Sequence, residues 1–470
     1  MKKVFIASLL ALSASIAAFA QQAETQEGGA ATEVNQYGQK VNSYPAEATV
    51  QDGILVFQNK NQNYKMWFDI RVQGDAAVFF GYDKNLTEIG NGMSLRRARF
   101  AVKAQLGKNW YGELDTDWTS GTTEIKDAYI AFTGVDNLEI KIGNFKENFS
   151  IQRNTTSRYL QFMERPMVTY LAPSRHLGIN VKYSLPYLWV SAGAFGPELE
   201  GSEAMTAFED ANKDFGANSG MSYTGKIVYR PLYKMKDASL HIGAAFSYRN
   251  PKASSTDGYP AIRYSTRNTT GINRKKFLDT DAITNLHHEL AWTAELAGHW
   301  KGLRWEGAYI ARLPYVDTEK SKITDITPAW GWYVQAGYLL FGGHQNYDEG
   351  GAKYTRTNNG RKWGDIELCA RVEYANFNIS KYCMGGSAYA YSLGLNFHVT
   401  KNVKFVVNYQ YNDNDVFANG KGKQDGTDKG KFYTGYDKSG NKTVYPGDMD
   451  MSNSKGIDYH MLACRFQVAF

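Results

Sequence analysis

Residues 459–470, YHMLACRFQVAF, form the stretch that decides the fold. From Leu462 to Phe470 every second residue is apolar, whereas Arg465 and Gln467 stand among the residues between them. Successive side chains of a β-strand point to opposite faces, so this alternation predicts a strand with one apolar face and one partly polar face. A chain that stops on such a strand leaves an open edge unless another strand pairs with it. We therefore expect a closed barrel, with lipid against the apolar side and water against the other.

The N-terminus has the layout of an export signal. Lys2 and Lys3 precede an apolar run, and residues 18–20, AFA, place small residues at a cleavage position. This order predicts a secretory signal peptide, residues 1–20, that is cleaved near Ala20. The mature chain would then be exported, and its aromatic C-terminus resembles the assembly signal of bacterial outer-membrane barrels.

We expect the exported chain to have two parts. Residues 21–64 carry little apolar periodicity and are predicted to form a mostly extended periplasmic lead-in. Residues 65–470 are predicted to form a transmembrane β-barrel, which would place the protein in the bacterial outer membrane.

Composition excludes several classes of protein. The 470 residues have a mean hydropathy of −0.47, and no run of about 18 apolar residues follows the signal peptide, which excludes helical membrane spans. The formal net charge of +6 is too small to indicate nucleic-acid binding. Three cysteines, Cys369, Cys383 and Cys464, do not make a disulfide framework, so we expect them to be ordinary packing residues.

Sixteen stretches of the chain are predicted to be strands, and an even number is what bacterial barrels of this kind require. Each is rich in alternating apolar and polar residues and is bounded by turn formers. The predicted strands are residues 65–80, 94–106, 110–118, 125–133, 138–146, 176–184, 187–196, 221–230, 238–249, 289–300, 303–313, 330–341, 363–377, 386–400, 403–411 and 459–470.

The connections between these strands alternate in length. Long or polar joins span residues 147–175, 197–220, 250–288 and 412–457, and most of the others are short. Short turns at one end and long loops at the other are typical of outer-membrane barrels. Residues 342–362 break the pattern, so either a strand is missed there or that turn is elaborated. A soluble β-sandwich would also alternate, but the export signal and the aromatic residues near strand ends favour the membrane barrel.

If the apolar residues face lipid, the residues between them line a lumen. A barrel of about 16 strands is wide enough to hold an aqueous channel. Its charged side chains either solvate the wall or, as a basic row facing an acidic row, orient and filter solutes. The predicted lumen-wall residues are Arg97, Arg99, Lys103, Glu113, Asp115, Asp117 and Arg371.

The chain resembles the phosphate-selective porin O and P family in a linked set of motifs. These are GNFKENFS at 143–150, TSR at 156–158, FMER at 162–165 and APSRHLG at 172–178, with LRRAR at 95–99 and GLNF at 394–397. The resemblance covers roughly residues 63–470. It implies a 16-stranded, homotrimeric porin whose third outer loop, residues 147–175, folds into the lumen.

The loop that the resemblance identifies is basic. Its candidate pore-constriction and anion-binding residues are Lys146, Arg153, Arg158, Arg165 and Arg175, opposed only by Glu147 and Glu164. Guanidinium groups offer paired donors to oxyanions and keep their charge, so they would raise the local concentration of anions. The alternative is structural, with Glu164 and Arg165 forming an internal ion pair that locks the loop to the wall.

We expect a channel for passive diffusion of small hydrophilic solutes. Its preference for anions such as phosphate should be weak, because acidic wall residues such as Glu113 and Asp127 oppose it. A non-conducting surface adhesin or structural barrel, and a porin for oligosaccharides, are the alternatives. The expected partners are outer-membrane lipid, the permeating solutes and further copies of the chain in a homotrimer.

No catalytic, metal or cofactor site is predicted. His287 and His288 precede Glu289, but neighbours on a strand point to opposite faces and could not bind one metal together. A GxSxG nucleophile motif is absent. An energy-coupled receptor needs about 22 strands and a plug, for which the chain has no room. The loop 412–457 is rich in Asp, Asn and Gly and is predicted to be a solvated outer loop.

Overall fold

The computed structural model describes residues 31–43, 45–51, 53–82, 84, 89–119, 121, 123–199, 220–250, 261–267, 271–272, 275–317, 319–321, 323–418, 436–441, 443, 446–450 and 456–470. The predicted signal peptide, residues 1–20, lies outside these ranges, and so does much of the loop 412–457. Within the described ranges, no helix is both long enough and apolar enough to cross a membrane.

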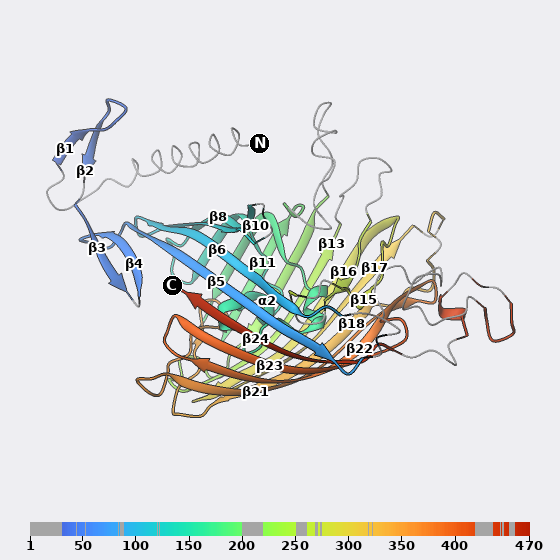
Figure 1. Cartoon of the computed structure of the whole chain (residues 1–470). Helices are drawn as coiled ribbons and strands as arrows, with labels where there is room; N and C mark the ends of the chain where they lie inside the picture. Colours follow the sequence, from blue (N-terminus) through green and yellow to red (C-terminus); the bar gives the residue numbers. More distant parts are fainter. Residues whose placement is uncertain are drawn as a thin grey trace.

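Sixteen antiparallel strands close into a barrel (Figure 1). Each pairs with the next along the chain, and β24 pairs with β5 to complete the circle, from His460↔Phe80 to Ala469↔Arg71. The prediction of an all-β barrel of about 16 strands is confirmed, with strand ends that differ by a few residues. The strands are β5 (Lys65–Phe80), β6 (Gly92–Leu106), β7 (Trp110–Asp117), β8 (Glu124–Phe132), β9 (Leu138–Lys146), β10 (Arg175–Ser184), β11 (Leu188–Phe195), β12 (Ser222–Tyr229), β13 (Ala238–Arg249), β16 (Leu286–Trp300), β17 (Leu303–Val316), β18 (Ala329–Leu339), β21 (Asp365–Ser380), β22 (Cys383–His398), β23 (Val403–Asn414) and β24 (Tyr459–Ala469).

Two hairpins precede the barrel, within the stretch predicted to be a lead-in. They are β1 (Ala31–Val34) with β2 (Lys40–Ser43), and β3 (Ala46–Gln51) with β4 (Ile54–Asn59). The second hairpin adds to the barrel sheet, because β4 pairs with the start of β5 from Val56↔Trp67 to Gln58↔Lys65.

The barrel is apolar on the outside and polar on the inside. In β24, the side chain of Phe466 is 43% exposed, whereas its neighbour Arg465 is 3% exposed. In β21, Leu368 is 48% exposed beside Glu367 at 2%. A soluble β-sandwich has the opposite arrangement, with apolar side chains between its sheets, so that alternative is excluded. The apolar outer face is the one that hydrocarbon covers in a membrane barrel.

The connection between β9 and β10, residues 147–174, lies inside the barrel, and we call it the inner loop. It contains α2 (Ile151–Asn154) and two 3-10 helices, η1 (Ser157–Tyr159) and η2 (Met167–Leu171). Figure 1 shows α2 within the ring of strands. The amide of Met163 donates to Oδ1 of Asn408 on β23 at 2.8 Å, and Arg304 on β17 donates to the carbonyl of Tyr159 at 3.0 Å. Strands far from β9 and β10 in the chain therefore hold this segment.

An apolar cluster packs the inner loop against one side of the barrel. Phe149, Met167 and Val168 of the inner loop meet Leu278 and Ile283 of the connection between β13 and β16. That connection also supplies the short strands β14 (Ser265–Thr266) and β15 (Leu278–Asp279). The wall behind the cluster contributes Ala291, Ala308, Ile310, Ala329, Tyr333, Ala375, Phe377, Ala388 and Ala390. Removing this apolar surface from water stabilises the inserted loops on the β16–β22 side.

The turn between β18 and β21, residues 340–364, is enlarged by secondary structure of its own. Of the two interpretations of residues 342–362, a missed barrel strand or an elaborated turn, the second is therefore correct. The turn carries a hairpin of β19 (Tyr347–Asp348) and β20 (Lys353–Tyr354), which we call the turn hairpin. Trp189 of β11 donates from Nε1 to the carbonyl of Gly350 at 3.0 Å, and the hydroxyl of Tyr354 donates to the carbonyl of Gly298 at 2.6 Å. The turn hairpin therefore folds into the barrel at the end where the short turns lie. One further 3-10 helix, η5 (Pro446–Asp448), lies in the last long loop.

Candidate functional site

Two open cavities lie along the β6–β10 side of the barrel. The outer cavity, toward the long loops, has a volume of about 370 Å³, and the inner cavity, toward the short turns, about 590 Å³. Arg99 and Arg175 line both cavities, so the two spaces meet at these side chains. We call this level the throat.

Each throat arginine is held by aspartates of neighbouring strands. The guanidinium of Arg99 lies 3.3 Å from Asp115 and 3.2 Å from Asp117. Arg175, the first residue of β10, donates to both carboxylate oxygens of Asp127, at 3.1 and 2.7 Å. Asp115 and Asp127 are direct partners in the β7–β8 register. Like charges in that position repel, so the arginines are needed to hold the two aspartates together.

The wall of the inner cavity continues the same pattern of pairs. The ammonium of Lys103 lies 2.9 Å from Asp69 and 3.5 Å from Glu113. Glu113 also accepts hydrogen bonds from the hydroxyls of Tyr111 and Tyr129, each at 2.9 Å. A basic row and an acidic row therefore do face each other here, which is one of the two sequence interpretations of the wall charges. The two rows are on adjacent strands and neutralise each other along one wall.

Three carboxylates gather on the inner side of the throat. One oxygen from each of Glu113, Asp115 and Asp127 lies within 4.8 Å of the others. We call these residues the carboxylate cluster. A basic side chain contacts each member, at distances between 2.7 and 3.5 Å. Carboxylate oxygens are ligands that cations prefer, so among the described residues this cluster is a place suited to a positive group.

Glu164 anchors the inner loop to the wall. Its carboxylate lies 2.9 Å from Arg96, 3.3 Å from Arg97 and 2.8 Å from Arg465. Burial acts to raise the pKa of Glu164, but the three guanidinium groups outweigh it and hold the pKa well below its usual range. The alternative in which Glu164 pairs with Arg165 is therefore wrong. The locking that it proposed is real, but the partners come from β6 and β24.

Glu147 fixes the start of the inner loop in the same way. It is fully buried and lies 2.6 Å from Nδ1 of His176 and 2.9 Å from Arg249. Burial acts to raise the pKa of Glu147, but the charges of Arg249 and His176 lower it to about 2. The carboxylate is therefore ionised, and it ties the loop to β10 and β13.

Three of the predicted anion-binding residues are held by backbone carbonyls. Arg165 donates to the carbonyls of Gln152 and Thr155, at 2.6 and 2.7 Å. Arg153 donates to another carbonyl of the inner loop at 3.2 Å, and Lys146 donates to the carbonyl of Arg153 at 3.1 Å. A carbonyl carries no net charge, so it does not neutralise the cation that it holds. Arg153 and Arg165 line the outer cavity, and Lys146 lines the inner one.

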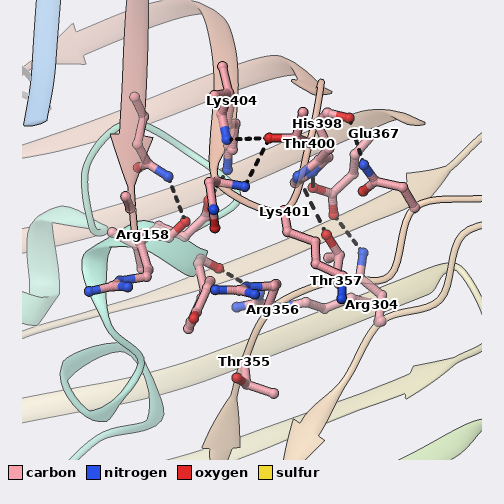
Figure 2. A pocket seen from close by; sticks show the side chains of 18 residues that line it. Arg158, Arg304, Thr355, Arg356, Thr357, Glu367, His398, Thr400, Lys401 and Lys404 are labelled. Carbon is pink, nitrogen blue, oxygen red and sulfur yellow. Dashed lines mark hydrogen bonds and ion pairs between the residues drawn. The ribbon is translucent and has the colours of Figure 1, made fainter. Parts of the chain in front are cut away.

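Arg158 lies near the end of the loop that points to the short turns, and it is paired rather than free. Its guanidinium forms an ion pair with Asp69. It also lines a small pocket of about 40 Å³, shown in Figure 2 with the basic side chains of Arg304 and Lys404. These two donate to backbone carbonyls of the inner loop at 3.0 and 2.7 Å. The pocket is therefore mainly a fastening of the inner loop to β17 and β23.

Arg371 lies beneath the inner loop, away from both cavities. Its guanidinium is 2.9 Å from Glu373, donates to the carbonyl of Glu164 at 3.0 Å and lies 4.5 Å from the ring centre of Phe162. It lines neither the outer nor the inner cavity. The other predicted wall residues do line them, at the outer cavity (Arg97, Asp117), the throat (Arg99) and the inner cavity (Lys103, Glu113, Asp115).

Several groups of the inner cavity were not found from the sequence. Asp348, Lys353 and Tyr354 come from the turn hairpin, and Arg71 comes from β5. The excessive length of the turn was the one available signal for the hairpin. It did not reveal that the segment folds into the barrel instead of outward into solution.

A sequence model described as phosphate-selective porin O and P matches residues 68–434, well over half of the chain. The chain belongs to this family. The porin is similar to Porin O of Pseudomonas aeruginosa, with 23% identity over 453 residues that cover 90% of this chain and 96% of that protein. Family membership and the apolar outer face place this porin in the outer membrane.

Solved structures of similar fold include two other proteins of the outer-membrane barrel type. One is OmpT, an outer membrane protein of Vibrio cholerae in a trimer form, with 12% identity, coverage of 87% of this chain and 99% of that chain, and a TM-score of 0.49. The other is an anion-selective porin from Comamonas acidovorans, with 10% identity, coverage of 87% and 100%, and a TM-score of 0.47.

Proposed function

We propose that this porin is a channel for the passive diffusion of small hydrophilic solutes, with a weak preference for anions. The observation that carries the proposal is the pair of cavities that meet at Arg99 and Arg175 inside a closed barrel. Eight basic and three acidic side chains line the outer cavity, and nine basic and six acidic ones line the inner cavity. An excess of positive charge along the path raises the local concentration of anions, phosphate among them.

The preference is weak because most of the charges are paired. Asp115, Asp117 and Asp127 neutralise the two throat arginines. The net attraction for anions therefore comes from lining cations that no carboxylate neutralises, among them Lys146, Arg153 and Arg165.

The remaining features of the proposal follow from the family and from the position of the inner loop. The inner loop is the element that narrows the path. It spans residues 147–174, one residue fewer than the predicted 147–175. The mature porin begins after Ala20, with residues 21–64 on the periplasmic side, and assembles as a homotrimer. Three equal conductance steps per insertion event would support the trimer.

Conductance of the purified porin in planar lipid bilayers tests the proposal. Stepwise currents should appear, and reversal potentials in asymmetric KCl should show chloride passing more readily than potassium. Lys146→Gln should lower the anion-to-cation permeability ratio by about a factor of two, because it removes a positive charge from the inner cavity. Lys301→Gln is the matched control, since Lys301 lies in the tight turn between β16 and β17 and lines neither cavity.

Two results would contradict the proposal. Membranes that stay silent at every porin concentration would favour a non-conducting barrel. If neither Lys146→Gln nor Lys301→Gln changed the anion-to-cation permeability ratio, the lining charges would not set ion preference.

A further inference from the structure

We infer that the throat favours dipolar solutes, with one ammonium group and one carboxylate as in amino acids, over uncharged solutes of equal size. The inference deepens the proposed channel function and rests on it. It comes from two unsatisfied groups of opposite character on the two sides of Arg99 and Arg175.

The first group is an acceptor in the carboxylate cluster. Asp115 is 6% exposed, and its Oδ2 lies 3.3 Å from Arg99. Its Oδ1 is buried and receives no hydrogen bond from any residue that the structure describes. A buried carboxylate oxygen without a donor is unfavourable, so a bound donor would stabilise it. Glu113 and Asp127 contribute oxygens within 4.8 Å, which favours a donor that carries positive charge.

The cations of this wall are shared between carboxylates. Arg99 serves both Asp115 and Asp117, and Lys103 serves both Asp69 and Glu113. Arg158 also pairs with Asp69, so three cations compensate these four carboxylates. An ammonium group of a solute can join this network without displacing a pair that is already complete.

The second group is a donor on the outer side of the throat. Nε of Arg153 is buried and has no acceptor among the described residues, and its NH2 group donates only to a neutral carbonyl. Arg165 lines the same cavity and is likewise held by carbonyls. A carboxylate satisfies such guanidinium donors better than water does, because the bond is charge-assisted.

The order of the two groups along the path explains the selectivity. A solute at the throat would place its carboxylate toward Arg153 and its ammonium toward Asp115. A simple anion finds partners only at the guanidinium groups of the outer cavity, and a simple cation only at the carboxylate cluster. A dipolar solute is stabilised on both sides of the throat, and this difference in affinity is the source of the selectivity.

Swelling of porin-containing liposomes tests the inference with glycine and its uncharged isomer glycolamide, at pH 7 and in EDTA. Glycine should enter severalfold faster than glycolamide through the wild-type porin. Asp115→Asn should bring the ratio of the two rates close to one, and Arg153→Gln should lower the same ratio from the other side of the throat. Glu139→Gln is the matched control. It removes one negative charge from the inner cavity, but Glu139 lies outside the carboxylate cluster and pairs with Lys182 at 3.0 Å.

The outcomes separate the inference from the channel itself. Equal rates for glycine and glycolamide through a conducting wild-type porin would overturn the inference and leave the proposed function standing. If Asp115→Asn and Glu139→Gln lowered the glycine-to-glycolamide ratio equally, the inference would also be overturned. The loss of any negative charge from the inner cavity would then explain the change. Liposomes that admit neither solute, together with silent bilayers, would overturn the channel and the inference together. Should Asp115→Asn fail to form the barrel, Arg153→Gln decides alone.

Discussion

Glu164 binds three arginines from the wall, although the inner loop supplies an arginine at the next position. Neighbouring side chains on an extended backbone diverge, so Glu164 points to the wall while Arg165 turns back to the carbonyls of Gln152 and Thr155. The partner Arg465 is 301 residues away in the chain. A single sequence suggests near neighbours as partners and does not contain this contact, which depends on the closed barrel.

Glu164→Gln should lower the free energy of unfolding in lipid vesicles by about 3 kcal/mol, because it removes the carboxylate of the buried Arg97 and one of the two carboxylates that hold Arg465. Urea titration of the folded barrel measures the change. The pKa of Glu164 is depressed in the folded protein, so its stabilisation is fully present above the unfolded value of about 4.3. The stabilisation is lost as the pH falls from there toward the folded pKa. The difference between wild type and variant should therefore be constant near neutral pH and shrink below about pH 4.

Glu139→Gln controls for the chemical change in that experiment. Glu139 is 22% exposed at its side chain and pairs with Lys182, so its loss should cost less than about 1 kcal/mol. If the two variants were equally stable at pH 7, Glu164 would not be the anchor of the inner loop.

At the scale of single elements, two β-bulges alter which way side chains point. The β5–β6 register shifts between Gln73 and Gly74, and both Arg96 and Arg97 reach Glu164 as a result. A similar shift in β16 brings His287 and His288 together, with their Nδ1 atoms 2.8 Å apart. The expectation that these histidines face opposite ways is wrong. A bulge adds a residue to one strand, and the apolar pattern on either side of it is unchanged, so the sequence gives little sign of it.

The turn hairpin is the element whose removal should most change the path. Replacing residues 346–355 with two glycines would take Asp348, Lys353 and Tyr354 out of the inner cavity. Single-channel conductance should rise about twofold, because the path loses one of its walls at the short-turn end. Tyr347→Phe is the control, since it removes only the 2.6 Å hydrogen bond to His241 and keeps the hairpin in place. Wild-type conductance after the replacement would show that the hairpin does not border the conducting path.

At the scale of the whole molecule, the strands were predictable wherever one face of the strand meets lipid and the other carries charged side chains. In β24 the apolar residues face out and Arg465 and Gln467 face in, as the alternation indicates. The β16–β22 side differs, because Ile310 and Phe377 face the apolar cluster inside the barrel. Both faces of the wall are apolar there, so the alternation of apolar and polar residues could not show where the inserted loops dock. It also could not show which side of the lumen stays open. The throat could not be predicted for the same reason, since its position depends on the side that the loops fill.

The most direct test of this account asks what covers the outer face of the barrel. Single nitroxide labels at positions 461–468 of β24, in porin reconstituted into lipid vesicles, report collisions with oxygen dissolved in lipid and with a water-soluble nickel chelate. Labels at 462, 464, 466 and 468 should collide freely with oxygen and rarely with the chelate, and those between them should not, giving a period of two. If the chelate reached positions 462, 464 and 466 as readily as oxygen does, water would cover the apolar face, and the porin would not span the membrane as described.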